Sequence, residues 1–125
     1  MLTFTVEFKP GISLFEQLVY AVKKAAVSGV LKPGDSFPSV RTISQELRIN
    51  PNTAHKAISA LVAEGILEVL PGVGTIVGKI PKATAEARGD LLGDEVERLV
   101  VEAKQLRLPL EELQRAVTEH WKRLT

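Results

Sequence analysis

Short polar and basic side chains recur along residues 50–59 with the spacing of one helix face. The polar members fall at i, i+3, i+4 and i+7: Asn52, His55, Lys56 and Ser59. Apolar residues repeat this spacing on roughly the opposite side: Ala54, Ala57, Ile58 and Leu61. Asn can form two hydrogen bonds to adenine and Thr can contact a thymine methyl group, so Asn52 and Thr53 suit a base-reading surface. The alternative is an ordinary solvated helix face, although such faces usually carry Glu–Lys pairs four residues apart, which this one lacks before Glu64.

This helix is predicted to begin at Asn50. Asn is a good N-cap, and Pro51 fits the first helical position because its missing N–H needs no partner there. Asn52 and Thr53 then lie in the first turn. We expect their backbone N–H groups and the positive end of the helix dipole to receive a phosphate or a base edge.

A shorter helix is predicted directly before this one. Ser39 can cap it, and Arg48-Ile49 forms a tight turn to the second helix. Its buried stripe is expected to consist of Val40, Ile43 and Leu47. Two helices joined in this way, with polar groups on the second, have the layout of a helix-turn-helix that reads DNA.

A β-hairpin is predicted after the second helix. Leu67 and Val69 alternate, a Leu-Pro-Gly-Val-Gly stretch breaks the pattern at 70–74, and Thr75-Ile76-Val77 resumes it. A hairpin in this place is the wing of a winged helix-turn-helix. The alternative is a phosphate-binding loop at Gly72-Val73-Gly74, but this segment opens no predicted helix and lacks the third glycine of that motif.

Several short motifs follow one another in a fixed order within residues 10–78. They are Gly29-Val30-Leu31-Lys32-Pro33-Gly34, Pro38-Ser39-Val40-Arg41, Asn50-Pro51-Asn52-Thr53, Leu61, Glu64-Gly65 and Gly72-Val73-Gly74-Thr75-Ile76-Val77. Together they resemble the DNA-binding domain of the GntR family of bacterial transcription regulators. The Asn-Pro-Asn-Thr form and the short chain are similar to the small YtrA-like subfamily.

The resemblance implies a sequence-specific transcription regulator, a repressor that binds double-stranded DNA at a palindromic operator as a homodimer. The positions that it assigns to DNA are Arg41, Asn50, Asn52, Thr53, His55, Lys56 and, at the wing tip, Gly72. The chain departs from the family pattern at the wing, where Pro71 and Val73 stand at positions that are often basic and Ile76 replaces a common Phe. His55 replaces what is commonly Arg or Lys, so its contact with guanine is not implied.

Residues 92–124 carry two apolar stripes on predicted helices. The first steps by four and three residues in a heptad-like seam: Leu92, Val96, Leu99, Ala103 and Leu106. Pro109 cannot continue that helix and instead starts another. The stripe of this last helix is Leu110, Leu113, Val117, Trp121 and Leu124. Two helices of this length cannot enclose a core by themselves, so they pack either on the preceding domain or against another chain. In the resembled subfamily this tail pairs two subunits, which implies a dimer interface here.

The expected fold is mainly α with a small β-hairpin. A winged helix-turn-helix DNA-binding domain is assigned to residues 1–80, and a linker with a two-helix dimerisation segment to residues 81–125. The alternation of residues 3–8 predicts a short leading strand. A polar stretch at 79–89 that contains a proline is the predicted linker.

The first helix of the domain is predicted from Ser13, which forms a capping-box signature with Glu16, to Ser28. Gly29 ends it, and Lys32-Pro33-Gly34-Asp35 is a predicted turn. Its inner face is expected to comprise Leu14, Leu18, Val22 and Ala25.

Charge is unevenly distributed, although the formal net charge is only +1. Residues 1–82 hold nine Lys/Arg against six Asp/Glu, whereas residues 83–125 hold seven against nine. The basic half contains the helix-turn-helix pattern, which supports a nucleic-acid partner. The absence of cysteine suits a reducing cytoplasm and excludes a thiolate metal site. No basic segment with an apolar run opens the sequence and no apolar run approaches about 18 residues, so neither secretion nor a membrane partner is expected.

No residue pattern predicts an enzyme. His55 lies on the proposed DNA-reading face and His120 stands beside Trp121 on an amphipathic helix, and the sequence has no P-loop, zinc-protease or nucleophile-elbow motif. No catalytic residue, metal or cofactor is therefore predicted, and no small-molecule effector is identified. Two alternatives stay open. One is a winged helix that binds protein or RNA without duplex DNA specificity. The other is a ligand-gated regulator with a pocket between wing domain and tail, although residues 83–125 show no cluster of convergent polar groups.

Overall fold

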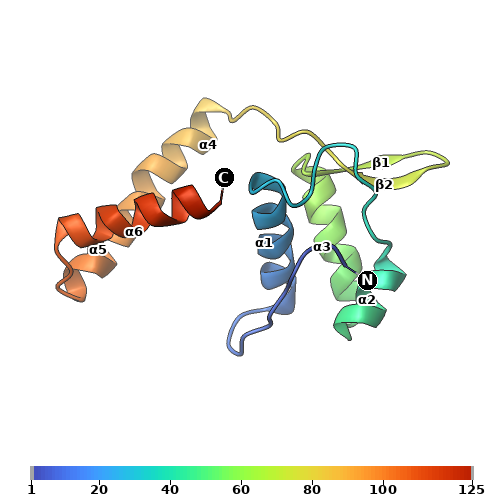
Figure 1. Cartoon of the computed structure of the whole chain (residues 1–125), viewed down its shortest axis with the longest axis horizontal. Coiled ribbons are helices and arrows are strands. Elements are labelled where there is room, and N and C mark those ends of the chain that lie inside the picture. Colours follow the sequence, from blue (N-terminus) through green and yellow to red (C-terminus); the bar gives the residue numbers. More distant parts are fainter. Residues whose placement is uncertain (1, 125) are drawn as a thin grey trace. The chain divides into compact units, whose positions relative to one another are not determined.

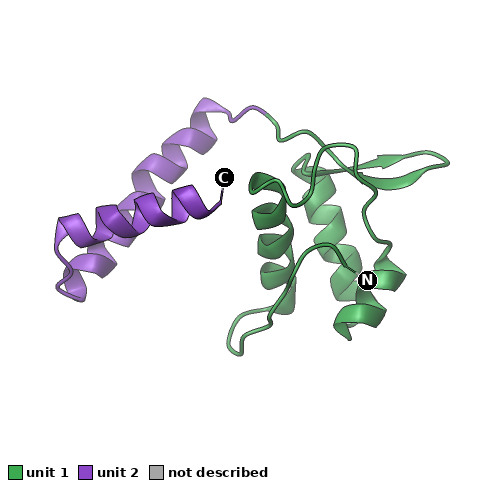
Figure 2. Cartoon of the chain, viewed as in Figure 1, with its two compact units in different colours: residues 1–81 green, residues 82–125 purple. Residues whose placement is uncertain are grey.

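The chain divides into two compact units, Met1–Pro81 and Lys82–Thr125 (Figure 2). The structure is a computed structural model that describes residues 2–124. The first unit contains three helices and a two-stranded hairpin, and the second contains the remaining helices (Figure 1). This arrangement is the predicted fold: a winged helix-turn-helix followed by C-terminal helices.

Helix α1 spans Leu14–Val27 and is set by its N-cap. The Ser13 hydroxyl oxygen accepts a hydrogen bond from the Glu16 N–H at 3.1 Å, as the capping-box signature predicts. The helix ends at Ser28, and Gly29 leaves it with a φ of 81°. Leu18, Val22 and Ala25 of the predicted inner face are buried. Leu14 is not, since it lies in the first turn and its side chain is 40% exposed.

Helix α2, Val40–Leu47, and helix α3, Pro51–Ala63, form the helix-turn-helix. The Ser39 hydroxyl accepts from the Thr42 N–H at 3.1 Å and begins α2. Arg48 adopts a left-handed conformation with a φ of 54°, which reverses the chain within two residues. Helix α3 packs against both α1 and α2 (Figure 1).

Small residues on α3 permit this close packing. Ala54 and Ala57 are both fully buried at 0% exposure. A larger side chain at either position would overpack the helix contacts, which typically costs about 1–3 kcal/mol. The core of this unit comprises Phe4, Leu18, Val22, Ala25, Leu31, Phe37, Ile43, Ile49, Ala54, Ala57, Ile58, Leu61, Leu67 and Val77.

The wing consists of strands β1, Leu67–Leu70, and β2, Gly74–Val77. They pair antiparallel, with Leu67 opposite Val77 and Leu70 opposite Gly74. A further segment that the sequence did not reveal lies beside β2. The Phe37 N–H donates to the Thr75 carbonyl, and the Gly34 N–H donates to the Val77 carbonyl, both at 2.8 Å. These bonds fix the base of the wing to the segment that leads into α2.

The predicted strand at residues 3–8 is wrong. This segment is an irregular N-terminal arm that passes over the helices without joining the sheet. The side-chain amide of Gln17 is hydrogen-bonded to the backbone of Lys9, which directly follows this segment. Its oxygen accepts from the Lys9 N–H at 2.6 Å, and its Nε2 donates to the Lys9 carbonyl at 2.9 Å. The ring of Phe4 is buried and stacks on Phe37, with 5.6 Å between ring centroids.

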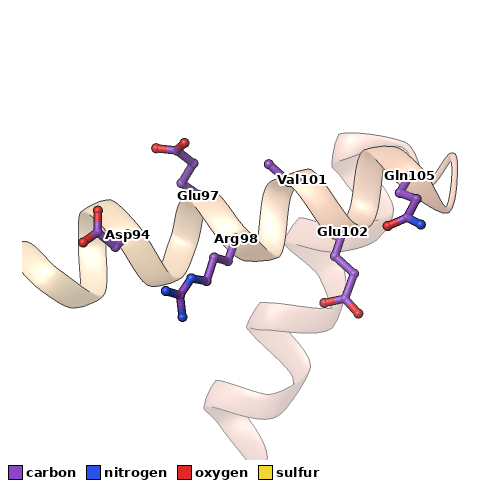
Figure 3. Close-up of a pocket in the computed structure, with 6 residues that line it drawn as sticks. All are labelled: Asp94, Glu97, Arg98, Val101, Glu102 and Gln105. Carbon is purple, nitrogen blue, oxygen red and sulfur yellow. The ribbon is translucent and has the colours of Figure 1, made fainter.

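The second unit is an almost continuous helical rod followed by a returning helix. Helix α4 (Ala85–Asp90), the π-helical turn η1 (Leu91–Glu95) and helix α5 (Val96–Gln105) follow one another directly. Figure 3 shows Asp94 of η1 and Gln105 of α5 on one continuous helical ribbon. Helix α6 spans Leu110–Arg123. The predicted linker at 79–89 is therefore too long, because the Thr84 hydroxyl accepts from the Ala87 N–H at 3.0 Å and starts a helix at Ala85.

The junction between α5 and α6 follows the prediction at Pro109. Arg107 has a φ of 59°, and the Leu108 N–H donates to the Ala103 carbonyl at 2.9 Å, which ends α5. Pro109 then precedes the first residue of α6. The π turn was not predicted. It contains Gly93, and π turns insert one residue into a helix, so they rotate the following side chains relative to the preceding ones.

Candidate nucleic-acid interface

The exposed side of α3 carries the polar residues named from the sequence. Asn52, His55 and Lys56 are exposed, and Thr53 is partly buried. The opposite side is buried at Ala54, Ala57, Ile58 and Leu61. Helix α3 therefore presents a polar face held by a core on its other side, which is the arrangement required of a helix that enters a DNA groove.

Asn50 is the N-cap of α3, so its side-chain oxygen is not available to contact DNA. Its Oδ1 accepts from the Asn52 N–H at 2.8 Å, and its backbone carbonyl accepts from the N–H groups of Thr53 at 3.0 Å and Ala54 at 3.2 Å. The side-chain NH₂ of Asn50 keeps two hydrogens for donation, since the cap uses only the oxygen.

The expectation that the first-turn N–H groups of α3 receive a phosphate or base edge is therefore wrong. Pro51 has no N–H, and those of Asn52 and Thr53 already donate to Asn50. Only the side chains and the helix dipole remain to act there. The Asn50-Pro51 pair that predicted the helix start also indicates this outcome, because a capping Asn accepts from the first-turn N–H groups and Pro has none.

The start of α2 offers the donors that α3 lacks. Ser39 uses its hydroxyl for the Thr42 N–H and its carbonyl for the Ile43 N–H. The N–H groups of Val40 and Arg41 precede the first intrahelical bond and have no acceptor among residues 2–124. Arg41 is also exposed, so the first turn of α2 carries an accessible basic residue as well as two unbonded backbone donors. Sequence reasoning found Arg41 and missed the two N–H groups.

Two further polar contacts involve residues of α2 and α3. Lys23 on α1 forms an ion pair with Glu64, the C-cap of α3, with 2.8 Å between Nζ and Oε1. Both side chains are more than a third exposed, so the pair adds at most about 1 kcal/mol. Ser44 is buried, and its hydroxyl donates to the Arg41 carbonyl at 3.0 Å. The first contact joins α1 to the end of α3, whereas the second is local to α2 and satisfies a buried hydroxyl.

The wing tip is exposed and carries no positive charge. Gly72 has a φ of 77°, and Val73 beside it is 70% exposed. Residues 66–78 contain Glu68 as their one charged residue and no Lys or Arg. The wing can approach a surface closely with its backbone, but it cannot neutralise a phosphate.

The helix-turn-helix and wing form a single unit with the geometry described above. The sequence profile of "Bacterial regulatory proteins, gntR family" matches residues 14–77, which is α1 through β2. The chain belongs to the GntR family. It is accordingly a DNA-binding transcription regulator, and the expectation that it is not an enzyme is confirmed by this membership.

GntR relatives share most of the length of this chain. It is 34% identical to the "HTH-type transcriptional repressor YtrA" of Bacillus subtilis over 115 residues, which cover 91% of this chain and 88% of that protein. It is 29% identical to the "Uncharacterized HTH-type transcriptional regulator YhcF" of the same organism, over 86% of this chain and 88% of that protein. The resemblance to the YtrA-like subfamily is thus supported across wing domain and tail.

Solved structures show the same architecture. A transcriptional antiterminator from Listeria monocytogenes superposes with a TM-score of 0.83 at 24% identity, over 97% of this chain and 91% of that one. YtrA from Sulfolobus acidocaldarius, described as a GntR-family transcription factor, superposes with a TM-score of 0.53 at 25% identity, over 92% and 97%. The first likeness concerns the fold alone.

Within residues 2–124, no helix is long and apolar enough to cross a membrane.

Proposed function

We propose that this GntR regulator is a repressor that binds a palindromic operator as a homodimer, in the cytoplasm where the chromosome lies. Its similarity over most of its length to YtrA of Bacillus subtilis, which is named a transcriptional repressor, supports this direction of regulation. The observation that carries the proposal is the face of α3 on which Asn52, His55 and Lys56 are exposed, opposite a fully buried side.

Within this proposal, Asn52 and Thr53 read bases. Their side chains are short and lie in the first turn of α3, so they reach a base only if that turn enters the major groove. Asn50 uses its oxygen as the N-cap, and its free NH₂ group is assigned a donor role toward DNA. His55 lies one turn further along the same face, where it can donate to a base or a phosphate.

Phosphates are held by longer side chains and by α2. Lys56 has a long flexible stem and a single charge, which suits contact with the DNA backbone. Arg41 and the two N–H groups at the start of α2 are assigned to one anion site, because a basic residue, two unbonded donors and the positive end of the helix dipole all belong to the first turn of α2. This site takes over the role that the sequence assigned to the backbone of α3.

The wing is assigned a minor share of the binding free energy. Gly72 allows the wing backbone to approach the minor groove. The uncharged side chains of Pro71 and Val73 are not attracted by the negative potential of that groove as an Arg side chain is. The free energy of binding from one domain is accordingly small, and a second copy is needed for useful affinity.

The second unit is proposed to supply that copy. Its apolar stripes are largely exposed: Leu92 is 66%, Leu106 65% and Trp121 75% accessible. Ala103 is the one buried apolar residue within 82–124. Nine residues of the two stripes are assigned to the dimer interface: Leu92, Val96, Leu99, Ala103, Leu106, Leu110, Leu113, Val117 and Trp121. Burial of such side chains against a twofold-related copy is the simplest way to remove them from water.

A twofold dimer presents two copies of α3 to DNA, so its operator is expected to be an inverted repeat. Selection of duplexes from a random pool with the full chain tests this. Enrichment of a symmetric sequence with two half-sites supports the proposal. Enrichment of a single asymmetric site, or tighter binding to RNA or to protein than to any duplex, would assign the winged helix to another role.

A further inference from the structure

A groove on the first unit lies between the N-terminal arm and α1, and no residue of α3 belongs to its lining. It encloses about 560 Å³. Val6 and Ile12 from the arm and its turn, and Tyr20 and Ala21 from α1, supply apolar surface to its lining. Tyr20 is 64% exposed and is the only tyrosine in the chain. Tyr20 is not among the residues assigned to DNA binding or to the dimer interface.

Charged residues of both signs line the same groove. Glu16 and Lys24 stand one turn before and one turn after Tyr20 on α1, and Glu7 and Lys9 belong to the arm. No ion pair joins any of these four charges to a described residue. Their neutralisation is thus left to water or to a ligand, and the two signs disfavour a simple anion or a simple cation.

The order of the groups on α1 defines the ligand. Glu16, Tyr20 and Lys24 are four residues apart, so they share one face and span about 12 Å along the helix axis. A molecule that satisfies all three carries an ammonium group at one end, an apolar body in the middle and a carboxylate at the other end. An extended tripeptide has this form, since three residues span about 10 Å.

We propose that this groove binds a zwitterionic small molecule with an apolar body, of the chemical type of a short apolar peptide. Its ammonium group lies against Glu16, its apolar part covers Tyr20 and Ala21, and its carboxylate lies against Lys24. Glu7 and Lys9 on the arm offer a second charge of each sign on the opposite wall.

The arm connects the groove to the DNA-binding elements. Thr5 and Val6 line the groove, and the neighbouring Phe4 stacks on Phe37. Phe37 donates its N–H to Thr75 of β2 and precedes the N-cap of α2 by two residues. A ligand that shifts the arm as it fills the groove therefore acts on both the wing and the start of α2. This coupling rests on the proposed function, and we expect occupancy to weaken duplex binding about fivefold or more, within the usual range of allosteric coupling.

NMR titration of the full chain with the tripeptide Ala-Phe-Ala tests the site directly. Amide shifts are expected at residues 5–9 and 16–24, followed by smaller shifts at Phe37 and Thr75. The same peptide with an acetylated N-terminus and an amidated C-terminus keeps the apolar body and loses both charges, so it should bind at least about fivefold more weakly. Equal affinity for the two peptides, or shifts confined to other residues, would overturn the proposal.

Substitutions separate the groove from the DNA function. Lys24→Gln and Glu16→Gln should each weaken the tripeptide severalfold, whereas Lys82→Gln, outside the groove, should not. Duplex titration with and without tripeptide then reports the coupling. Groove shifts in a chain that binds no duplex would leave the site standing and remove the proposed function, whereas tight duplex binding without groove shifts would do the reverse. If Tyr20→Ala reduces self-association and leaves the peptide shifts unchanged, the groove is a subunit contact and the inference fails.

Discussion

The two units of this chain treat their apolar residues in opposite ways. In the first unit, Leu18 and Leu61 are 1% and 0% exposed and lie within a shared core. In the second unit, Leu92 and Trp121 belong to apolar stripes of equally regular sequence spacing and remain 66% and 75% exposed. An apolar periodicity therefore predicts a face, and only the number of elements available to cover that face decides whether the unit folds alone or requires a partner.

The largest expected effect comes from breaking the tail. Leu99→Asp places a charge in the proposed dimer interface and should convert the full chain to a monomer in sedimentation experiments at tens of micromolar. Affinity for the selected duplex should fall by about 10²–10⁴, because the second half-site no longer binds with a high effective concentration. Glu97→Asp, on the same helix outside the stripe, is the matched control. Retention of the wild-type dimer in Leu99→Asp would contradict the assigned interface.

Leucine truncation in each unit sharpens the same comparison. Leu61→Ala opens a cavity in a fully buried site and should lower the free energy of unfolding by about 2–5 kcal/mol at any protein concentration. Leu92→Ala should lower stability only through the dimer, so its effect should depend on protein concentration. Urea unfolding followed at two concentrations measures both. A concentration-independent loss in Leu92→Ala would show that this residue packs within its own chain.

Arg41→Ala tests the anion site at the start of α2. The substitution removes the guanidinium and keeps both unbonded N–H groups of the first turn, and we expect a loss of about 1.5–3 kcal/mol for a hydrogen bond to a charged group. The loss should be similar on selected and scrambled duplexes and should reduce the salt dependence of binding, since phosphates are common to both. Anisotropy titrations at several salt concentrations provide the measurement. A loss confined to the selected duplex would instead make Arg41 a base-reading residue.

The smallest expected effect concerns the N-cap of α3. Asn50→Ala removes the acceptor of the Asn52 N–H and should lower the free energy of unfolding by about 0.5–2 kcal/mol. Asn50→Ser, which can also cap, should lose much less stability. Thermal unfolding of the two variants separates capping from any DNA contact of the amide. Equal destabilisation by Ala and Ser would mean that the cap is not what Asn50 contributes.

Local sequence signals predicted most of the helix-turn-helix correctly. Asn50-Pro51 fixed the start of α3 because capping and the missing proline N–H act within two residues. Ser13 and Ser39 did the same for α1 and α2. Pro109 marked the junction in the tail for a similar reason, since it cannot continue a helix.

The errors lie where distant residues decide the outcome. Residues 3–8 have the alternation of a strand, but the segment joins no strand and is held by packing, since Phe4 is buried and stacks on the distant Phe37. The pairing of Phe37 with Thr75 joins positions far apart in sequence and leaves no periodic signal. The π turn at Leu91–Glu95 depends on a single extra residue per turn, which heptad spacing does not resolve.

The candidate site was located from residue types, whereas the roles within it required the hydrogen bonds. The polar face of α3 follows from its 3.6-residue periodicity. That its first-turn N–H groups are occupied follows only from counting each donor and acceptor around Asn50. The same accounting of donors leaves the N–H groups of Val40 and Arg41 unbonded, so the backbone anion site is assigned to α2 in place of α3.

The most direct test of the account compares Asn52→Ala with Lys56→Ala in titrations on the selected duplex and on a scrambled one. Asn52→Ala should lose about 1–3 kcal/mol on the selected duplex and little on the scrambled one. Lys56→Ala should weaken both about equally and reduce the salt slope by about one. If the two variants lose the same free energy on both duplexes, α3 does not read bases through its first turn and the proposed interface is wrong.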